Sequence, residues 1–161
     1  MKALHNVSST ATGKSLALQR LWTLTLLLGD AMQAGLEERG LTVARAALMW
    51  QLQEDGSSTQ QALSRALRVT PRNITGLVDA LEADGLVARS AHPTDRRATV
   101  VSLTDKGSTL ARSLKRDQDK AAQDLFNDLP PADLAAFVRV VDRVIVGVMS
   151  SLREGAKGWL R

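Results

Sequence analysis

A carboxylate followed by two arginines, Asp95-Arg96-Arg97, lies between two segments whose composition is typical of β-strands. Pro93 falls in their connection, where its missing N–H donor does little harm. The segments therefore predict a two-stranded hairpin with this triplet at its tip. An arginine there would gain from the negative potential of a narrow DNA minor groove, and a carboxylate can hold its flexible side chain in place beforehand. The triplet thus indicates a hairpin in which Arg97 reads groove shape and Asp95 orients it.

The helix predicted before this hairpin carries side chains that suit hydrogen bonding to base edges and phosphates. Thr70 and Pro71 form an N-cap and first-turn pair, and the apolar spacing continues to about Ala83, before Gly85. A glycine on the outward face would let the backbone approach a groove closely. Taken alone, the outward residues favour the interpretation of a solvated helix face. The outward positions are Arg72, Asn73, Thr75 and Gly76, and the inward ones are Ile74, Leu77, Val78 and Leu81.

A shorter amphipathic segment, STQQALSRALR, precedes this helix and is predicted to brace it. Ser57 or Ser58 would cap the segment, and Leu63 and Leu67 would face the following helix. Two short helices across a tight turn form a helix-turn-helix, in which the first helix braces and the second projects. Because the hairpin follows directly, it would act as a wing beside the projecting helix. This arrangement favours nucleic-acid binding over a merely solvated face.

Long apolar helices are predicted outside this central region, one from Ser15 to about Arg39 and one from about Ala132 to Arg153. A further helix from about Thr42 to Gln53 follows the first of these. The last helix carries apolar residues at alternating spacings of three and four, a stripe that needs a partner helix. We expect both terminal helices to form a subunit interface, with packing inside one chain as the alternative. The proposed interface residues are Leu18, Leu134, Val138, Val141, Ile145, Val148 and Leu152.

The composition is that of an ordinary globular chain of 161 residues, with 44% hydrophobic residues, 24% charged residues and a net charge of +4. There is no cysteine, which excludes disulfides and thiol chemistry and suits a reducing cytoplasm. The apolar run from Leu21 to Leu28 is far shorter than the roughly 20 residues of a membrane span. We therefore expect a cytoplasmic protein with no membrane partner.

Enzymatic motifs are weak in this sequence. TATGKS at positions 10–15 ends like a phosphate-binding loop, but Ser8 stands where that loop requires its first glycine, and no strand precedes it. The two histidines, His5 and His92, lie too far apart in the sequence to indicate a zinc site. We predict no catalytic residue, no metal and no cofactor.

Residues 95–107, DRRATVVSLTDKG, follow the pattern D-x-R, five residues, L-T, two residues, G. Together with LVDALEADGLVAR at 77–89 and the Leu-Thr pair at 41–42, they resemble the MarR family of winged-helix transcriptional regulators. The resemblance covers residues 15–155. It implies a mainly α (α+β) fold, a winged helix-turn-helix with N- and C-terminal dimerisation helices. The expected parts are a frayed 1–14, a DNA-binding region 41–104, and dimerisation helices in 15–40 and 105–155.

The resemblance also implies how DNA is bound. Family members are homodimers whose paired winged helices bind a pseudo-palindromic operator in double-stranded DNA, most often as repressors. Arg97 would be the minor-groove arginine, with Asp95 as its partner and Arg96 as a backbone or minor-groove contact. Contacts from the projecting helix would come from Arg72, Asn73 and Thr75. Ser58 and Thr59 are further candidates for phosphate contacts, and Gly76 lies on the same helix face as Arg72 and Thr75. Arg68 is another candidate and replaces a small residue in the turn. For Arg89, a structural role is favoured.

Small aromatic or phenolic anions commonly release members of this family from DNA. The corresponding pocket walls here would be Trp22, Leu26, Met49 and Trp50, although these residues could simply belong to the core. No tyrosine is present, so no polar anchor for a ligand stands out. A winged helix can also bind other proteins. Salt dependence discriminates between the two functions, since DNA binding weakens steeply with salt and an apolar protein interface does not.

Overall fold

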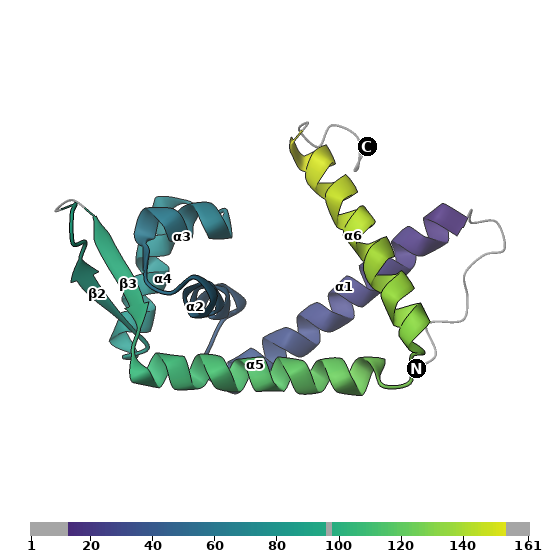
Figure 1. The fold of residues 1–161 in the computed structure, drawn as a ribbon, viewed down its shortest axis with the longest axis horizontal. Helices are drawn as coiled ribbons and strands as arrows, with labels where there is room; N and C mark the ends of the chain where they lie inside the picture. Colours follow the sequence, from purple (N-terminus) through teal and green to yellow (C-terminus); the bar gives the residue numbers. More distant parts are fainter. Residues whose placement is uncertain (1–12, 96–97, 154–161) are drawn as a thin grey trace. The chain divides into compact units, whose positions relative to one another are not determined.

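A computed structural model describes residues 13–95 and 98–153 (Figure 1). Helices dominate it, and a small three-stranded sheet is inserted among them. The helices are α1 (Gly13–Glu37), α2 (Val43–Asp55), α3 (Gln60–Leu67), α4 (Pro71–Ala83), α5 (Asp105–Phe126) and α6 (Pro131–Arg153), and the strands are β1 (Ser58–Thr59), β2 (Val87–Ala91) and β3 (Thr99–Leu103). None of the described helices is both long enough and apolar enough to cross a membrane.

The sheet is antiparallel with the strand order β1-β3-β2. β2 and β3 form the predicted hairpin, with Val87 opposite Leu103 and Ala91 opposite Thr99. β1 was not expected from the sequence, because two residues are too few to show an alternating pattern. It pairs Ser58 with Val101 and ties the start of α3 to the wing, here defined as β2, β3 and their connection.

Threonines begin the central helices by accepting a backbone hydrogen bond at each N-terminus. Thr42 accepts from the N–H of Arg45, and Thr70 accepts from that of Asn73, followed by Pro71 as predicted. The prediction for α3 was wrong by one or two residues. Its N-cap is Thr59 rather than Ser57 or Ser58, because Ser58 and Thr59 both pair with β3 and the helix begins only where this strand ends.

The core of the winged helix lies between α2, α3, α4 and the sheet. Its members include the predicted inward residues of α4, with Leu77 half-buried beside them. The buried polar group Ser64 donates its hydroxyl to the carbonyl of Val69 at 2.7 Å, which ties α3 to the turn before α4. The largest fully buried side chains are Leu48, Met49, Leu63, Ile74, Leu81, Val78, Val87 and Val101.

The start of α5 closes the open end of the hairpin. Thr104 accepts the N–H of Gly107 at 3.0 Å and donates its own hydroxyl to the carbonyl of Gly85 at 2.7 Å. Gly107 lies so close to β2 that a Cβ added there would fall 1.9 Å from the carbonyl oxygen of Leu86. This close approach explains why glycine occupies the first turn of α5 despite its low helix propensity.

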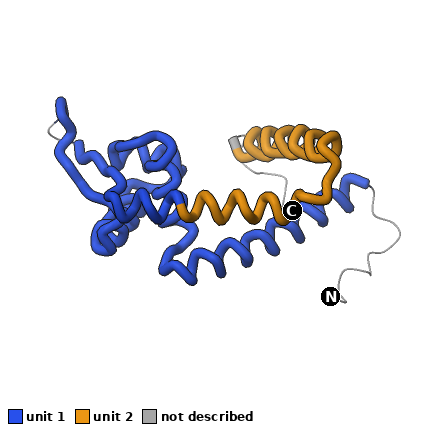
Figure 2. The backbone as a smooth tube through the Cα atoms, turned by 60° about the horizontal axis from the view of Figure 1, so that its bottom comes forward, with its two compact units in different colours: residues 1–112 blue, residues 113–161 orange. Residues whose placement is uncertain are grey.

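The chain divides into two units, residues 1–112 and residues 113–161, coloured separately in Figure 2. Within the first unit, α1 contacts α2, and Leu36 at its end is buried. α1 begins at Gly13, so Gly13 and Lys14 are helical rather than frayed, and Ser15, where the helix was predicted to begin, lies inside it. Within the second unit, the rings of Phe126 and Phe137 lie with centroids 5.8 Å apart.

Candidate nucleic-acid interface

One face of α4 is free to meet a partner. Ile74 and Val78 are fully buried, which fixes the rotation of the helix. The four residues predicted to face outward, Arg72, Asn73, Thr75 and Gly76, are all exposed. We call these four residues the α4 face. Helical spacing places them on the first two turns, where the side chains of a projecting helix reach base edges.

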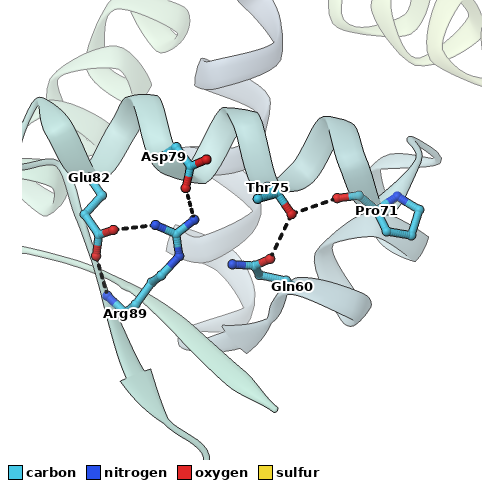
Figure 3. A network of polar contacts seen from close by, with 6 residues as sticks. All are labelled: Gln60, Pro71, Thr75, Asp79, Glu82 and Arg89. Atoms are coloured by element: carbon cyan, nitrogen blue, oxygen red, sulfur yellow. Dashed lines mark hydrogen bonds and ion pairs between the residues drawn. The ribbon is translucent and has the colours of Figure 1, made fainter. Parts of the chain in front are cut away.

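Part of the α4 face is already held by α3. The hydroxyl of Thr75 lies 3.1 Å from the carbonyl of Pro71 and 3.3 Å from Oε1 of Gln60, the first residue of α3 (Figure 3). The hydroxyl proton is therefore used within the protein, while its oxygen can still accept a hydrogen bond. Gln60 was not among the predicted site residues, because nothing in the sequence pairs it with a residue 15 positions away.

The wing is fastened to α4 by Arg89 of β2. Its guanidinium forms ion pairs with Asp79 and Glu82, both on α4, in a fork that Figure 3 shows from close by. Glu82 also accepts the backbone N–H of Arg89 at 3.1 Å. The side chain of Arg89 is 23% exposed and that of Asp79 is 60% exposed. This placement agrees with the structural role favoured for Arg89 and links the projecting helix to the wing.

Burial alone would lower the pKa of Arg89, but the contacts with Asp79 and Glu82 outweigh it and raise the pKa above its ordinary value. A raised pKa means that the charged form is favoured by folding. The fork's contribution to stability is therefore complete at lower pH and is lost only as the pH rises through the raised value. Across the neutral range, Arg89 remains charged and the fork stays intact.

The wing turn, here residues 92–95, is described up to Asp95, and Arg96 and Arg97 lie outside the described residues. The turn is closed by backbone hydrogen bonds from His92 N–H to Ala98 at 3.1 Å and from Ala98 N–H to Asp95 at 3.0 Å. Asp95 is exposed. The placement of Asp95 agrees with the predicted hairpin tip, and its role toward Arg97 stays a prediction.

A cleft of about 490 Å³ lies between the wing and the start of α3. Polar side chains dominate its walls, and it opens beside the wing turn. Its lining residues are Thr59, Gln60, Gln61, His92, Asp95, Ala98 and Thr99. The cleft thus lies between β1 and α3, which brace the projecting helix, and the turn that carries the tip.

The other predicted DNA contacts lie at the start and end of α3. Ser58 and Thr59 are half-buried in β1. Arg68 is exposed in the turn before α4, where it has a left-handed backbone with φ of 54°. This conformation is unusual for a residue with a Cβ. It explains why a small residue such as glycine would suit the position better than arginine does.

The residues proposed as pocket walls fall into different surroundings. Trp22 and Leu26 on α1 are 57% and 68% exposed, whereas Met49 on α2 is fully buried in the core. Trp50 is half-buried, and within the described part of the chain its buried Nε1 has no hydrogen-bond partner. The proposed interface residues are partly or largely exposed: Leu18, Leu134, Val138, Val141, Ile145, Val148 and Leu152.

A second ion-pair cluster, which the sequence did not reveal, braces α2 against the end of α4. Arg45 pairs with Asp84 and donates to the carbonyl of Gly40 at 3.1 Å, and Lys106 donates to the backbone carbonyl of Asp84 at 2.7 Å. The four residues come from segments up to 66 positions apart, from Gly40 to Lys106, so no local pattern could have indicated the cluster.

The central part of the chain matches a known protein family. Residues 41–99, which span α2 to the start of β3, match the model of the MarR family. The chain is 26% identical over 117 residues to the HTH-type transcriptional regulator MhqR of Bacillus subtilis, covering 73% of this chain and 81% of MhqR. It is 37% identical over 70 residues to the HTH-type transcriptional repressor NicR of Pseudomonas putida, covering 44% of each chain.

Solved structures share the fold. FabT of Streptococcus pneumoniae, crystallised in complex with DNA, has a TM-score of 0.79 at 16% identity, covering 85% of this chain and 98% of FabT. BpsR of Bordetella bronchiseptica, whose DNA binding is regulated by 6-hydroxynicotinic acid, has a TM-score of 0.63 at 24% identity over 80% of this chain and 98% of BpsR. Residues 41–99 thus match the MarR family, and the curated relatives compared with this chain are transcriptional regulators rather than enzymes.

Proposed function

We propose that the chain binds a pseudo-palindromic operator in double-stranded DNA as a homodimer. The observation that carries this proposal is the exposed α4 face, linked to the wing by the ion pairs of Arg89. Arg72 and Asn73 would contact base edges or phosphates in the major groove, and Thr75 would accept a hydrogen bond there. Arg97, steered by Asp95, would enter the adjacent minor groove, with Arg96 beside it.

The supporting contacts to the DNA backbone would come from residues around α3. Ser58 and Thr59 lie near the start of this helix, where backbone N–H groups favour phosphate oxygens. Arg68 lies at its other end, exposed in the turn that leads to α4. Such contacts fix the register of the protein on DNA but carry no sequence information themselves.

Unburied apolar surface supports the homodimer. Leu18 on α1 is exposed, and α6 separately exposes Val138, Ile145 and Leu152. Exposed apolar side chains gathered on a helix often belong to an interface, because leaving them in water is unfavourable. A dimer would also place two α4 helices on successive major grooves, about one helical turn of DNA apart. We assign dimerisation to α1 and α6.

Repression with release by a small aromatic or phenolic ligand is the regulatory part of the proposal. NicR is named a repressor, and BpsR responds to an aromatic acid, 6-hydroxynicotinic acid. In this chain, Trp22, Leu26 and Trp50 would form aromatic and apolar walls, and Met49 would support them from the core. The buried Nε1 of Trp50, which has no partner among the described residues, could donate to an acceptor atom of such a ligand.

The test is selection from a random double-stranded DNA pool with the purified protein, followed by affinity measurement on the enriched sequence. The proposal predicts an inverted repeat whose half-sites are centred about 10 base pairs apart. A matched control is the Asn73→Ala, Arg72→Ala double variant, which removes side chains from the exposed α4 face. If the pool yields no enriched sequence, operator binding is wrong and a protein-binding winged helix becomes the better account.

A further inference from the structure

The imidazole of His92 acts as a hydrogen-bond acceptor for the wing turn. Its Nδ1 lies 3.2 Å from the backbone nitrogen of Asp95 and 3.3 Å from that of Thr94. The hydroxyl of Thr94 lies 3.4 Å from the same ring nitrogen. Backbone N–H groups can only donate, so Nδ1 must carry the lone pair and the ring proton must lie on Nε2. The turn that ends at Asp95 is thus fixed by a neutral histidine.

The hydrogen bonds of the His92 ring resemble those of turns in which the side chain of an aspartate or asparagine is the acceptor. In such turns, a side-chain acceptor binds the N–H group two residues ahead, which stabilises the reversal of the chain. The His92 backbone also closes the hairpin through Ala98. One residue therefore holds both sides of the turn, its backbone N–H on the return side and its ring on the N–H groups of Thr94 and Asp95.

Protonation would reverse the role of this nitrogen. An imidazolium carries hydrogens on both ring nitrogens and has no acceptor left, and histidine is the side chain that ordinarily changes charge between pH 5 and 8. The two backbone N–H groups would then face a donor instead of an acceptor. The turn would lose both contacts at once, and the position of Asp95 would no longer be fixed by the ring.

The side chains that line the cleft beside His92 are mostly uncharged. The elements around its cleft contribute Thr59 from β1, Gln60 and Gln61 from α3, and Thr99 from β3, all uncharged. Asp95 is the one charged residue among the cleft's described lining. His92 is half-buried and lines this cleft. Arg96 and Arg97 are the charged neighbours in sequence.

We propose that His92 is a positioning residue whose neutral imidazole holds the wing turn in its DNA-binding shape, so that protonation of the imidazole loosens the wing and weakens operator binding. This inference rests on the proposed DNA-binding function. Added positive charge alone would strengthen binding to a polyanion. Protonation of His92 is therefore expected to weaken operator binding, whereas the added charge alone would strengthen it. The sign of the change in affinity distinguishes the two effects.

The first experiment needs no DNA. The backbone amides of Thr94 and Asp95 are followed by ¹H–¹⁵N NMR in the full chain from pH 7.5 to 5.5, together with the His92 ring. We expect both amide signals to move with the same midpoint as the ring. In His92→Asn, which keeps an acceptor that does not titrate, they should not move. Amides that stay in place while the ring titrates would overturn the inference, whatever the protein binds.

The second experiment measures affinity for the selected operator at pH 7.5 and pH 5.5. The wild type should lose about tenfold between the two values, as expected for two lost hydrogen bonds. His92→Asn should bind like the wild type at pH 7.5 and lose much less at pH 5.5, and His92→Ala should bind weakly at both. His5→Asn, which removes the other histidine, should behave like the wild type.

Circular dichroism at both pH values shows that each variant remains folded. Equal pH dependence in the wild type and His92→Asn would overturn the inference, and so would tighter binding at pH 5.5 that depends on His92. A failure to find any operator would defeat the proposed function and leave the NMR result to stand alone.

Discussion

Arg72 is the residue of the α4 face best suited to specific contacts, because a guanidinium can bind a guanine edge or a phosphate with two hydrogen bonds. Removing it in Arg72→Ala should lower operator affinity by about 1–3 kcal/mol, roughly tenfold to a hundredfold. Fluorescence anisotropy on the selected operator measures this change. Arg72→Lys is the matched control, since it keeps the charge and loses the fork. A lysine variant that binds like the wild type would show that Arg72 contacts a phosphate only.

Arg68 combines an unfavourable backbone with a useful position. Its left-handed conformation, with φ of 54°, costs free energy that glycine would not incur. Arg68→Gly should therefore raise the free energy of unfolding by about 0.5 kcal/mol and also weaken DNA binding by removing a charge near the backbone. Chemical denaturation and anisotropy measure the two effects. Greater stability with unchanged affinity would remove Arg68 from the interface.

At the residue scale, the apolar spacing of the sequence predicted which side chains of a helix are buried and which are exposed. The positions of Ile74 and Val78 imply that Arg72 and Asn73 face outward, and the structure confirms this. The partners of Thr75 and Arg89 could not be predicted in the same way. Gln60 and Glu82 reach them from other elements, and many such pairings are compatible with one sequence. Long-range polar contacts depend on tertiary placement, which periodicity does not encode.

At the element scale, the Arg89 fork should couple the wing to α4. Arg89→Ala should lower the free energy of unfolding by about 1 kcal/mol, because the pairs are partly exposed, and should lower operator affinity although Arg89 need not touch DNA. A double-mutant cycle with Glu82→Gln isolates the coupling. If the two substitutions are additive in both stability and affinity, the fork does not join the two elements.

Gly107 and Gly76 both lie where the backbone is expected to come close to another group, namely the carbonyl of Leu86 for Gly107 and bound DNA for Gly76. Gly107→Ala should destabilise the fold by at least about 2 kcal/mol, since the new Cβ would collide with the backbone carbonyl of Leu86. Gly76→Ala meets no atom within 4 Å, so it should stabilise α4 slightly and weaken DNA binding if the helix backbone approaches the groove. Thermal denaturation and anisotropy separate these outcomes. Equal stability effects would contradict this account of Gly107.

The helices and the hairpin could largely be predicted, because caps, breakers and apolar spacing are local signals. Thr70 with Pro71 marked the start of α4, and Gly85 marked its end. β1 was missed, and the cap of α3 was misplaced with it. A two-residue strand exists only because β3 offers a free edge beside Ser58, and that edge is a product of the tertiary fold.

At the scale of the whole molecule, the apolar stripe of α6 should hold two chains together. Val141→Asp would bury a charge in that interface and should weaken dimerisation by about 3 kcal/mol, roughly a hundredfold in dissociation constant. Analytical ultracentrifugation measures this change. Val140→Asp is the matched control, since Val140 is exposed and lies off the stripe. If Val141→Asp sediments as the wild type does, the interface lies elsewhere.

If the exposed α4 face and the wing bind DNA, operator affinity must depend steeply on salt concentration. The logarithm of the association constant is measured against the logarithm of salt concentration for the wild type and for Arg97→Ala. We predict a steep negative slope, about 0.9 for each phosphate neutralised, and a shallower slope with weaker binding in the variant. A flat slope in the wild type would contradict DNA binding. A slope and affinity that Arg97→Ala leaves unchanged would remove the wing from the interface.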